Sequence, residues 1–196
     1  ESGSGKTTFS RLVNGLIPNY YEGTLTGKVR VEDKNPEEVE LHELAPYVGS
    51  VFQNPKAQFY TLITDTEIVF ACENMGMDCG EILRRFDTTV TAMHLESLIG
   101  RNLFTLSGGE KQKIACASVH ALQPDVLVLD EPTSNLDIGT IHEMENILRL
   151  WKALGKTVIV AEHRLDWLRL LADRVLYFKD GKIEQEFTGA AFFEKP

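Results

Sequence analysis

The sequence predicts an α/β fold in which helices flank a mainly parallel sheet. Two short apolar runs carry this prediction, residues 126–129 (VLVL) and residues 157–161 (TVIVA). Strands that are buried on both faces of a parallel sheet read as continuous apolar segments of this kind. Segments with apolar residues at helical spacing lie around them, so we expect one α/β domain that also contains a helical subdomain.

Composition and charge exclude several classes of protein. The chain has 196 residues, of which 43% are hydrophobic, enough for one domain with a sizeable core. The formal net charge is -9 and no basic run occurs, so we expect no nucleic-acid partner, because affinity for phosphate backbones rests on clustered Lys and Arg. No apolar run approaches the roughly 18 residues that span a bilayer, and no signal peptide opens the chain. Any membrane contact is therefore expected through a partner.

The three cysteines, Cys72, Cys79 and Cys116, are an odd number and lack the spacing of a metal site. Cys72 and Cys116 lie in apolar segments with helical spacing. We expect buried free thiols in a reducing compartment rather than a disulfide or a metal centre.

The chain opens with a phosphate-binding pattern. Apart from its first glycine, ESGSGKTT matches G-x-x-x-x-G-K-[ST], in which Lys6 reaches the terminal phosphates and the Thr7 hydroxyl can ligate Mg²⁺. A Gly/Ser-rich tag is the alternative, but an amphipathic helix follows at once, with Pro18 beyond its end. The strand that normally precedes such a loop is missing, so we expect the sequence to be a fragment that begins within the nucleotide-binding loop. The candidate nucleotide-binding residues here are Glu1, Ser2, Gly3, Ser4, Gly5, Lys6, Thr7 and Thr8.

Two strands are expected next, at residues 27–31 and 47–52, with an acidic loop at 33–40 between them. The second strand runs into Gln53. An amide at a strand exit can ligate a metal or position a water, although a glutamine there is more often a solvated loop residue. Gln53 becomes a candidate only in combination with the residues described below.

A mainly helical stretch follows, from about residue 64 to residue 123, and we expect it to form the helical subdomain. The core would then comprise residues 1–63 and 124–196. Apolar stripes at 68–72 and at Ile82, Leu83, Phe86, Val90 and Met93 have helical spacing, and we expect both to face the core, with a loop at 76–80 between the two helices.

The strand at 126–129 ends in Asp130 and Glu131. Side chains of neighbouring strand residues point to opposite sides, so two adjacent carboxylates can have different roles. One can ligate a metal while the other hydrogen-bonds to a water. A solvated turn before Pro132 is the alternative. We disfavour it because Ser107-Gly108-Gly109 lies just ahead of a helical pattern, where free backbone N–H groups can meet an anion.

The strand at 157–161 ends in Glu162-His163-Arg164. A lone histidine is more often structural, but His163 is expected at the carboxyl edge of the sheet, together with Asp130 and Glu131, where ligands of open α/β sheets bind. We therefore expect His163 to face phosphate, and we assign no role to His42, His94, His120 and His142. The remaining expected elements are a helix over residues 141–154 ended by Gly155, a helix at 165–172, a strand at 175–178, a tight turn at Asp180-Gly181 and a strand at 182–184.

Taken together and in this order, these motifs resemble the nucleotide-binding domain of ABC ATPases over the whole chain, which implies a P-loop NTPase fold. Lys6 and Thr7 are similar to Walker A, Gln53 to the Q-loop glutamine, and Leu106 to Glu110 to the signature. Asp130 is similar to the Walker B carboxylate that holds Mg²⁺, Glu131 to the general base, Asn135 to Asp137 to the D-loop, and His163 to the switch histidine.

The resemblance implies ATP and Mg²⁺ as cofactors, with Glu131, His163 and Lys6 as catalytic residues and Thr7, Gln53 and Asp130 around the metal. In that family two domains pair head to tail, and ATP lies between Walker A of one and the signature of the other. A second ABC ATPase domain, identical or different, is then the expected partner, and a single copy should be inactive. Ser107 of the signature is then expected to contact a partner's nucleotide. The further candidate nucleotide-binding residues are Gly108, Gly109, Glu110 and Asp137.

Within the family, residues 52–55, 58–59, 162–165 and 172–174 resemble those of energy-coupling-factor or cobalt-type importers, which take up vitamins or transition-metal ions in prokaryotes. The resemblance implies an ATP-hydrolysing subunit held on the cytoplasmic face of the membrane by transmembrane subunits. The sequence departs from the family pattern at Glu110, where many members have Gln, and at Lys113, where many have Arg. The upstream aromatic residue that stacks on adenine has no counterpart.

Three alternatives remain. A soluble mechanical ATPase of the same superfamily would act in DNA repair or translation; repair members carry long heptad coiled coils, and residues 8–106 hold none. A module that senses nucleotide without hydrolysing it is disfavoured by Glu131 and His163. A kinase or GTPase has no use for the LSGGE signature.

Overall fold

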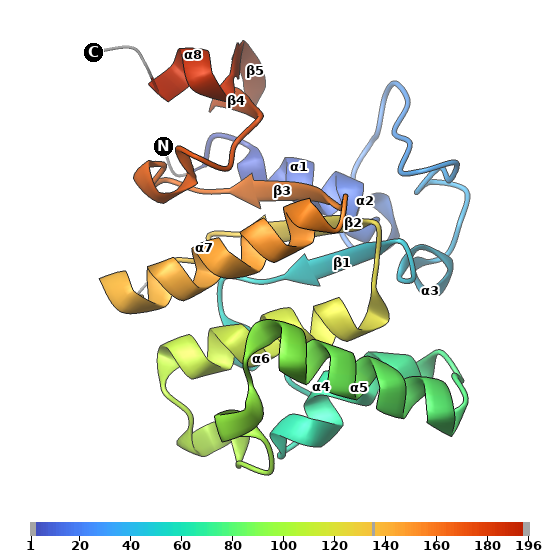
Figure 1. The fold of residues 1–196 in the computed structure, drawn as a ribbon. Coiled ribbons are helices and arrows are strands. Elements are labelled where there is room, and N and C mark those ends of the chain that lie inside the picture. Colours follow the sequence, from blue (N-terminus) through green and yellow to red (C-terminus); the bar gives the residue numbers. More distant parts are fainter. Residues whose placement is uncertain (1–2, 135, 194–196) are drawn as a thin grey trace.

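The computed structural model describes residues 3–134 and 136–193, and a three-stranded parallel sheet lies at its centre (Figure 1). The strands are β1 (Val48–Val51), β2 (Val126–Asp130), β3 (Thr157–Ala161), β4 (Arg174–Lys179) and β5 (Lys182–Thr188). The helices are α1 (Lys6–Val13), α2 (Leu16–Asn19), α3 (Leu41–Leu44), α4 (Thr64–Asn74), α5 (Cys79–Met93), α6 (Gly108–Leu122), α7 (Ile138–Ala153) and α8 (Gly189–Phe193). Short 3₁₀ turns occupy Pro55–Ala57, Glu96–Leu98, Leu103–Thr105 and Asp166–Leu168.

The sheet has the order β1-β2-β3, and all of its pairs are parallel. Val51 pairs with Leu129, and Asp130 pairs with Ala161, so the carboxyl ends of the three strands lie at one edge. Strands β4 and β5 form a separate antiparallel hairpin. The predicted strands at 47–52, 126–129, 157–161, 175–178 and 182–184 are therefore confirmed, with small shifts of their ends.

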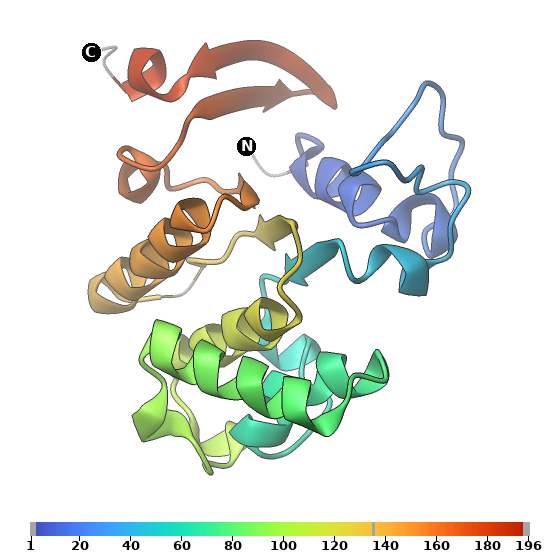
Figure 2. The ribbon, with the colours of Figure 1, turned by 45° about the vertical axis from the view of Figure 1, so that its right-hand side comes forward.

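Strand β2 divides the core into two apolar layers. Val126 and Val128 pack with Val13 of α1 on one face of the sheet. Leu127 and Leu129 belong to the larger cluster, which also holds residues of α4, α6 and α7 on the other face. This alternation follows from the pleat of a strand, whose successive side chains point to opposite faces. Helices α1 and α6 thus lie on opposite faces of the sheet, and α4, α5 and α6 gather below it in both ribbon views (Figures 1 and 2).

The structure corrects the predicted strand at residues 27–31. Val31 makes a single bridge to Lys34 across its own turn, and residues 27–30 form no strand. Alternation alone does not make a strand, because a ladder needs a neighbouring chain, and in the described part of the molecule this segment pairs only with itself.

Three predictions about the helices were also wrong in part. The segment at 165–172 forms a 3₁₀ turn over Asp166–Leu168 followed by turns, because most of its N–H groups bond three residues back, as from Leu168 to Leu165 at 3.0 Å. Leu83 does not face the core, since it is 58% exposed on α5. Helix α5 also begins at Cys79, inside the predicted loop, because the side chain of Asp78 caps it.

The thiols of Cys72 and Cys116 are free and buried, as predicted, whereas Cys79 is exposed. Burial raises the pKa of both buried thiols above the ordinary value, so both stay protonated. No helix in residues 3–134 and 136–193 is long and apolar enough to cross a membrane.

Candidate functional site

The loop before α1 rests on the turn of the β4–β5 hairpin. Gly5 precedes α1 with a φ of 102°, a conformation that glycine adopts without strain. The N–H of Gly181 donates to the carbonyl of Ser4 at 3.1 Å, and a Cβ on Gly5 would lie 3.2 Å from the Gly181 Cα. Lys6 donates through Nζ to the Ser4 hydroxyl at 3.2 Å. Glu1 and Ser2 lie outside the described residues; Gly3 and Thr8 are exposed.

Thr7 and Asp130 meet across the start of α1 and the end of β2. The Thr7 hydroxyl donates to Oδ1 of Asp130 at 3.3 Å, although 123 residues separate them. Burial raises the pKa of the Asp130 carboxyl above its ordinary value, and the hydrogen bond from Thr7 acts in the opposite direction. A half-buried carboxylate of this kind is costly unless a donor or a cation offsets its charge.

Glu131 lies between residues from the two neighbouring strand exits. Its Oε2 accepts from Nε2 of Gln53 at 2.9 Å, and its Oε1 lies 3.0 Å from Nε2 of His163. Gln53 follows β1 and His163 follows β3, so the parallel register brings both to the end of β2. Glu131 has a φ of 46°, in the left-handed region that costs a residue with a side chain roughly 1–2 kcal/mol. Strain of this kind is often found where a side chain must be aimed.

The oxygen atoms of Thr7 and Asp130 suit a Mg²⁺ ion. Thr7 offers a hydroxyl that lies 3.3 Å from the Asp130 carboxylate, and hard oxygen ligands are those that Mg²⁺ prefers. Gln53, whose Nε2 contacts the neighbouring Glu131, has an amide oxygen that is a further candidate ligand. A cavity of about 550 Å³ opens beside Thr7 and Asp130. Among the described residues no cluster of three His, Cys, Asp or Glu could hold a metal by itself.

The predicted signature lies at the start of α6, on the other face of the sheet from α1. Ser107 is exposed and forms a capping box with Glu110: the Ser107 hydroxyl accepts from the Glu110 N–H at 3.2 Å, and the Glu110 carboxylate accepts from the Ser107 N–H at 2.7 Å. Gly108 and Gly109 begin the helix, and Arg101 pairs with Glu110 at 2.7 Å. The hydrogen bond from the Ser107 N–H, followed by that from Arg101, lowers the pKa of Glu110.

The structure gives Asp137 a capping role. Its Oδ1 accepts from the Thr140 N–H at 3.0 Å and its Oδ2 accepts from the Thr140 hydroxyl at 3.0 Å, at the start of α7. The backbone hydrogen bond from Thr140 lowers the pKa of Asp137. The side chain is otherwise exposed. Asn135, assigned with it to the D-loop, lies outside the described residues.

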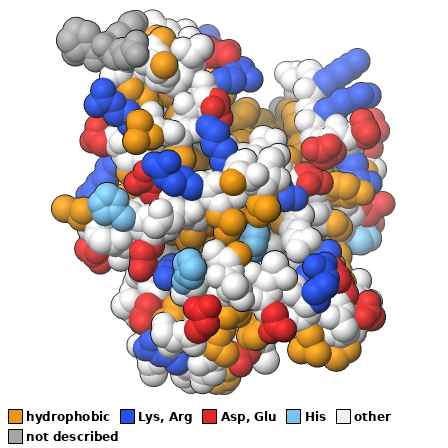
Figure 3. Space-filling model, viewed as in Figure 1, with side chains coloured by type: hydrophobic (Ala, Val, Ile, Leu, Met, Phe, Trp, Pro, Cys, Tyr) orange, Lys and Arg blue, Asp and Glu red, His pale blue; other side chains and the backbone are white. Residues whose placement is uncertain are grey.

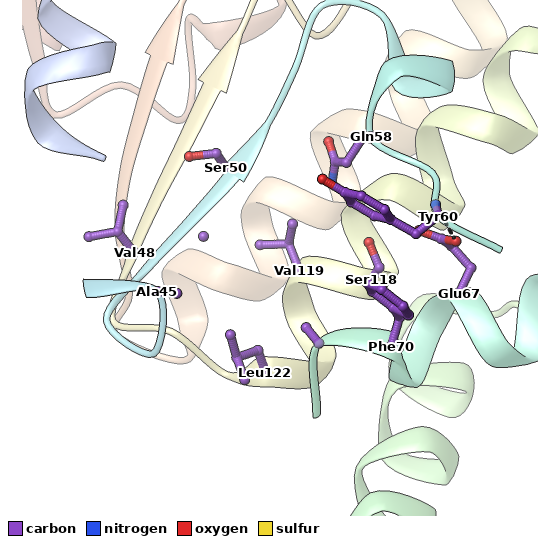
Figure 4. A pocket seen from close by; sticks show the side chains of 12 residues that line it. Ala45, Val48, Ser50, Gln58, Tyr60, Glu67, Phe70, Ser118, Val119 and Leu122 are labelled. Carbon is purple, nitrogen blue, oxygen red and sulfur yellow. Dashed lines mark hydrogen bonds between the residues drawn. The ribbon is translucent and has the colours of Figure 1, made fainter. Parts of the chain in front are cut away.

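The segment that follows Gln53 is fixed to α4 at the edge of a groove of about 190 Å³ between β1, α4 and α6 (Figure 4). Glu67 is 2% exposed, and its Oε2 accepts from the N–H groups of Tyr60 at 3.0 Å and Thr61 at 2.8 Å. The ring of Tyr60 stacks on that of Phe70, with 5.0 Å between centroids. These contacts join the segment after Gln53 to α4.

Sequence reasoning missed Thr133 and Glu162 at this edge. Oε2 of Glu162 accepts from the Thr133 hydroxyl at 2.5 Å, and its Oε1 accepts from the N–H of His163 at 2.7 Å. In the sequence, Glu162 carries only part of the resemblance to energy-coupling-factor or cobalt-type importers. Its position next to His163, at the end of an apolar strand, is the signal that could have identified it.

Comparisons with known proteins show the family to which the chain belongs. The ABC transporter family model matches residues 1–134. A protein from Treponema denticola named as an ABC transporter ATP-binding protein is 45% identical over 195 residues, which are 100% of this chain and 40% of that protein. A protein from Pyrococcus abyssi with the same description is 41% identical over 194 residues, 98% of this chain and 69% of its own length.

The solved structure of cbiO1 from Clostridium perfringens, described as part of the ABC transporter complex cbiONQ, superposes with a TM-score of 0.87. It is 29% identical, and the match covers 98% of this chain and 76% of that one. The chain belongs to the ABC transporter family, as an ATP-binding domain with the P-loop fold.

Proposed function

We propose that this chain hydrolyses ATP to power an importer of the energy-coupling-factor or cobalt type, which takes up vitamins or transition-metal ions. The observation that carries the enzymatic part is the position of Glu131 between Gln53 and His163, next to the Thr7–Asp130 contact. The likeness to cbiO1 supports the importer class. Because the chain spans 40% of the length of its Treponema relative, the activity and partners of the whole protein are part of the proposal.

In the proposed reaction Glu131 accepts the proton of the attacking water, and His163 keeps the carboxylate directed at it. Lys6 offsets negative charge on the terminal phosphates. Thr7, Asp130 and the amide oxygen of Gln53 would hold Mg²⁺, which supplies further charge compensation when bound.

The exposed signature supports a two-copy arrangement. Ser107 and Gly108 lie at the surface of the α4–α6 helices, on the other face of the sheet from the phosphate loop, so they are accessible to the nucleotide of a second ABC ATPase domain. We propose that transmembrane subunits hold the pair at the cytoplasmic face of the membrane. The contacts of Glu67 with the Gln53 loop would then pass closure of the pair to those subunits, provided that they bind the open and closed states differently.

Glu131→Gln tests the enzymatic proposal in the full protein with its partner domain. The substitution keeps the shape and one acceptor oxygen but removes the base, so phosphate release should fall by about 100-fold or more while ATP binding persists. Glu186→Gln, an exposed carboxyl on β5, is the matched control and should release phosphate at the wild-type rate. Unchanged turnover in Glu131→Gln would refute the assignment of the base.

Purification tests the importer proposal. An importer subunit should be extracted from membranes together with hydrophobic subunits and should hydrolyse ATP faster in their presence. A soluble mechanical ATPase would purify without them.

The surface charge does not favour a nucleic-acid partner. On the face shown in Figure 3, acidic and basic side chains of the described residues are interspersed, unlike the continuous basic surface of a nucleic-acid site.

A further inference from the structure

Glu162 joins the two loops that carry Glu131 and His163. It follows β3, and its Oε2 accepts from the Thr133 hydroxyl at 2.5 Å. Its Oε1 accepts from the backbone N–H groups of His163 at 2.7 Å and Arg164 at 3.3 Å. Thr133 is 1% exposed, so water does not compete for its hydroxyl. One carboxylate therefore bridges the loop after β2 and the loop after β3.

The loop after β2 holds Glu131 in its left-handed conformation. The Glu131 N–H donates to the carbonyl of Ala161 at 2.8 Å, and the Glu131 carbonyl accepts from the N–H of Ser134 at 3.1 Å. Thr133 lies inside this turn, so the bond from Thr133 to Glu162 fixes the turn against the neighbouring strand. A φ of 46° at a glutamate is kept only where its surroundings hold it.

We propose that Glu162 is a positioning residue for the ATPase reaction: it clamps the turn at 131–134 to the loop that begins at His163, and so sets the 3.0 Å contact between Glu131 and His163. The inference rests on the proposed function, because it concerns the alignment of the proposed base. Glu162 acts through Thr133 and the His163 backbone, and its two carboxylate oxygens are engaged there.

Loss of the carboxylate would leave the buried Thr133 hydroxyl unpaired and free the His163 backbone. The turn could then relax, and Glu131 would point away from its reactive direction. Misplacement of a reacting group by about 1 Å can cost roughly 100-fold in rate. Nucleotide affinity should change little, because Lys6 and Thr7 lie on a different loop.

Five variants of the full protein with its partner domain separate positioning from general folding. Glu162→Ala and Thr133→Val each remove one half of the bridge. Glu162→Gln can still accept from the His163 N–H and donate to Thr133, and Thr133→Ser keeps the hydroxyl. Glu186→Ala removes an exposed carboxylate that pairs with Arg174 on the hairpin, and serves as the control.

We expect Glu162→Ala and Thr133→Val to lower kcat about 10- to 100-fold, with the KM for ATP within about twofold of wild type. Glu162→Gln, Thr133→Ser and Glu186→Ala should stay within about threefold of wild type in kcat. Combined with Glu162→Ala, Thr133→Val should lower kcat no further than Glu162→Ala alone, because both substitutions remove the same bridge. A kcat for Glu162→Ala within about twofold of wild type, or effects of Glu162→Ala and Thr133→Val that simply multiply, would overturn the inference.

Two further measurements keep the inference separate from the proposed function. If Glu162→Ala does not fold, the Thr133→Val and Thr133→Ser pair decides on the same kinetic criteria. If the wild-type protein binds ATP but shows no turnover, the proposed function fails, and crystal structures decide on the clamp. The Glu131–His163 contact should then persist in Glu162→Gln and be lost in Glu162→Ala, and its persistence in both would overturn the clamp.

Discussion

Gln53 donates its amide Nε2 to Oε2 of Glu131 at 2.9 Å, although 78 residues separate the two in the sequence. The contact joins the loop after β1 to the carboxylate at the end of β2. Gln53 therefore influences the direction of the proposed base, besides being a candidate metal ligand. Its contact with Glu131 can be tested by a substitution that keeps the oxygen atom of the side chain.

Gln53→Glu should lower turnover about 10- to 100-fold. It replaces the N–H group that donates to Glu131 at 2.9 Å with a second carboxylate, and two like charges at this distance repel each other. The repulsion would turn the Glu131 carboxylate away from its reactive direction, and misplacement of a reacting group by about 1 Å can cost roughly 100-fold in rate. Steady-state phosphate release checks this. Gln185→Glu adds the same charge on exposed β5 and should leave turnover unchanged; wild-type turnover in Gln53→Glu would contradict the prediction.

Thr7→Val should raise the Mg²⁺ concentration that gives half-maximal turnover by about tenfold or more. The substitution keeps the size of the side chain but removes the hydroxyl that donates to Asp130 at 3.3 Å, together with a candidate metal ligand. Thr7→Ser retains the hydroxyl and should behave as the wild type. A Mg²⁺ titration of phosphate release distinguishes them, and equal requirements in the two variants would remove Thr7 from the metal site.

The sheet edge could be predicted because its residues directly follow apolar runs. Asp130 and Glu131 follow the apolar part of β2, and His163 comes two residues after β3, so a parallel sheet brings them to one edge whatever the details of the helices. The functional roles of these residues remain predictions; the structure adds their distances.

Other features depend on partners that no local pattern encodes. Residues 27–31 alternate like a strand but have only Lys34 to pair with in the described structure, at Val31. The bond from Thr133 to Glu162 joins residues 29 positions apart in two loops, where no periodicity operates. The left-handed φ of Glu131 likewise arises from hydrogen bonds to Ala161 and Ser134, not from its own preference.

Gly109→Ala should cost about 1–3 kcal/mol of stability, because a Cβ there would lie 2.5 Å from Cγ2 of Thr140 at the start of α7. Gly108→Ala is the matched control, since its Cβ would meet nothing within 4 Å. That substitution should be neutral or stabilising by up to about 1 kcal/mol, the ordinary gain of alanine over glycine in a helix. Thr140→Ala in the Gly109→Ala background should recover part of the loss. Urea unfolding measures all four proteins, and equal stabilities of the two glycine variants would show that α6 and α7 are not tightly packed there.

His120 and Trp151 give the fold a dependence on pH. The Trp151 Nε1–H donates to Nδ1 of His120 at 3.0 Å; Trp151 is 0% exposed and His120 6%. Burial, and then the charge of Lys156, lowers the pKa of His120 below its ordinary value, so the folded protein holds this histidine neutral. The unfolded chain binds a proton first as the pH falls, and the stability contributed by the neutral histidine is therefore lost from about pH 6.5 downward, toward the lower folded pKa.

His120→Gln keeps an acceptor for Trp151 and cannot titrate, so its free energy of unfolding should fall less steeply between about pH 7 and pH 5 than that of the wild type. His120→Leu removes the acceptor and leaves the buried indole N–H unpaired, which should cost about 1–3 kcal/mol at pH 7 and above. Because leucine cannot titrate, this difference from the wild type should shrink as the pH falls. Urea unfolding at several pH values checks both, and parallel wild-type and His120→Gln curves would show that His120 is not the titrating group. Since His120 lies on α6 and Trp151 on α7, acid should loosen the packing of these two helices against each other.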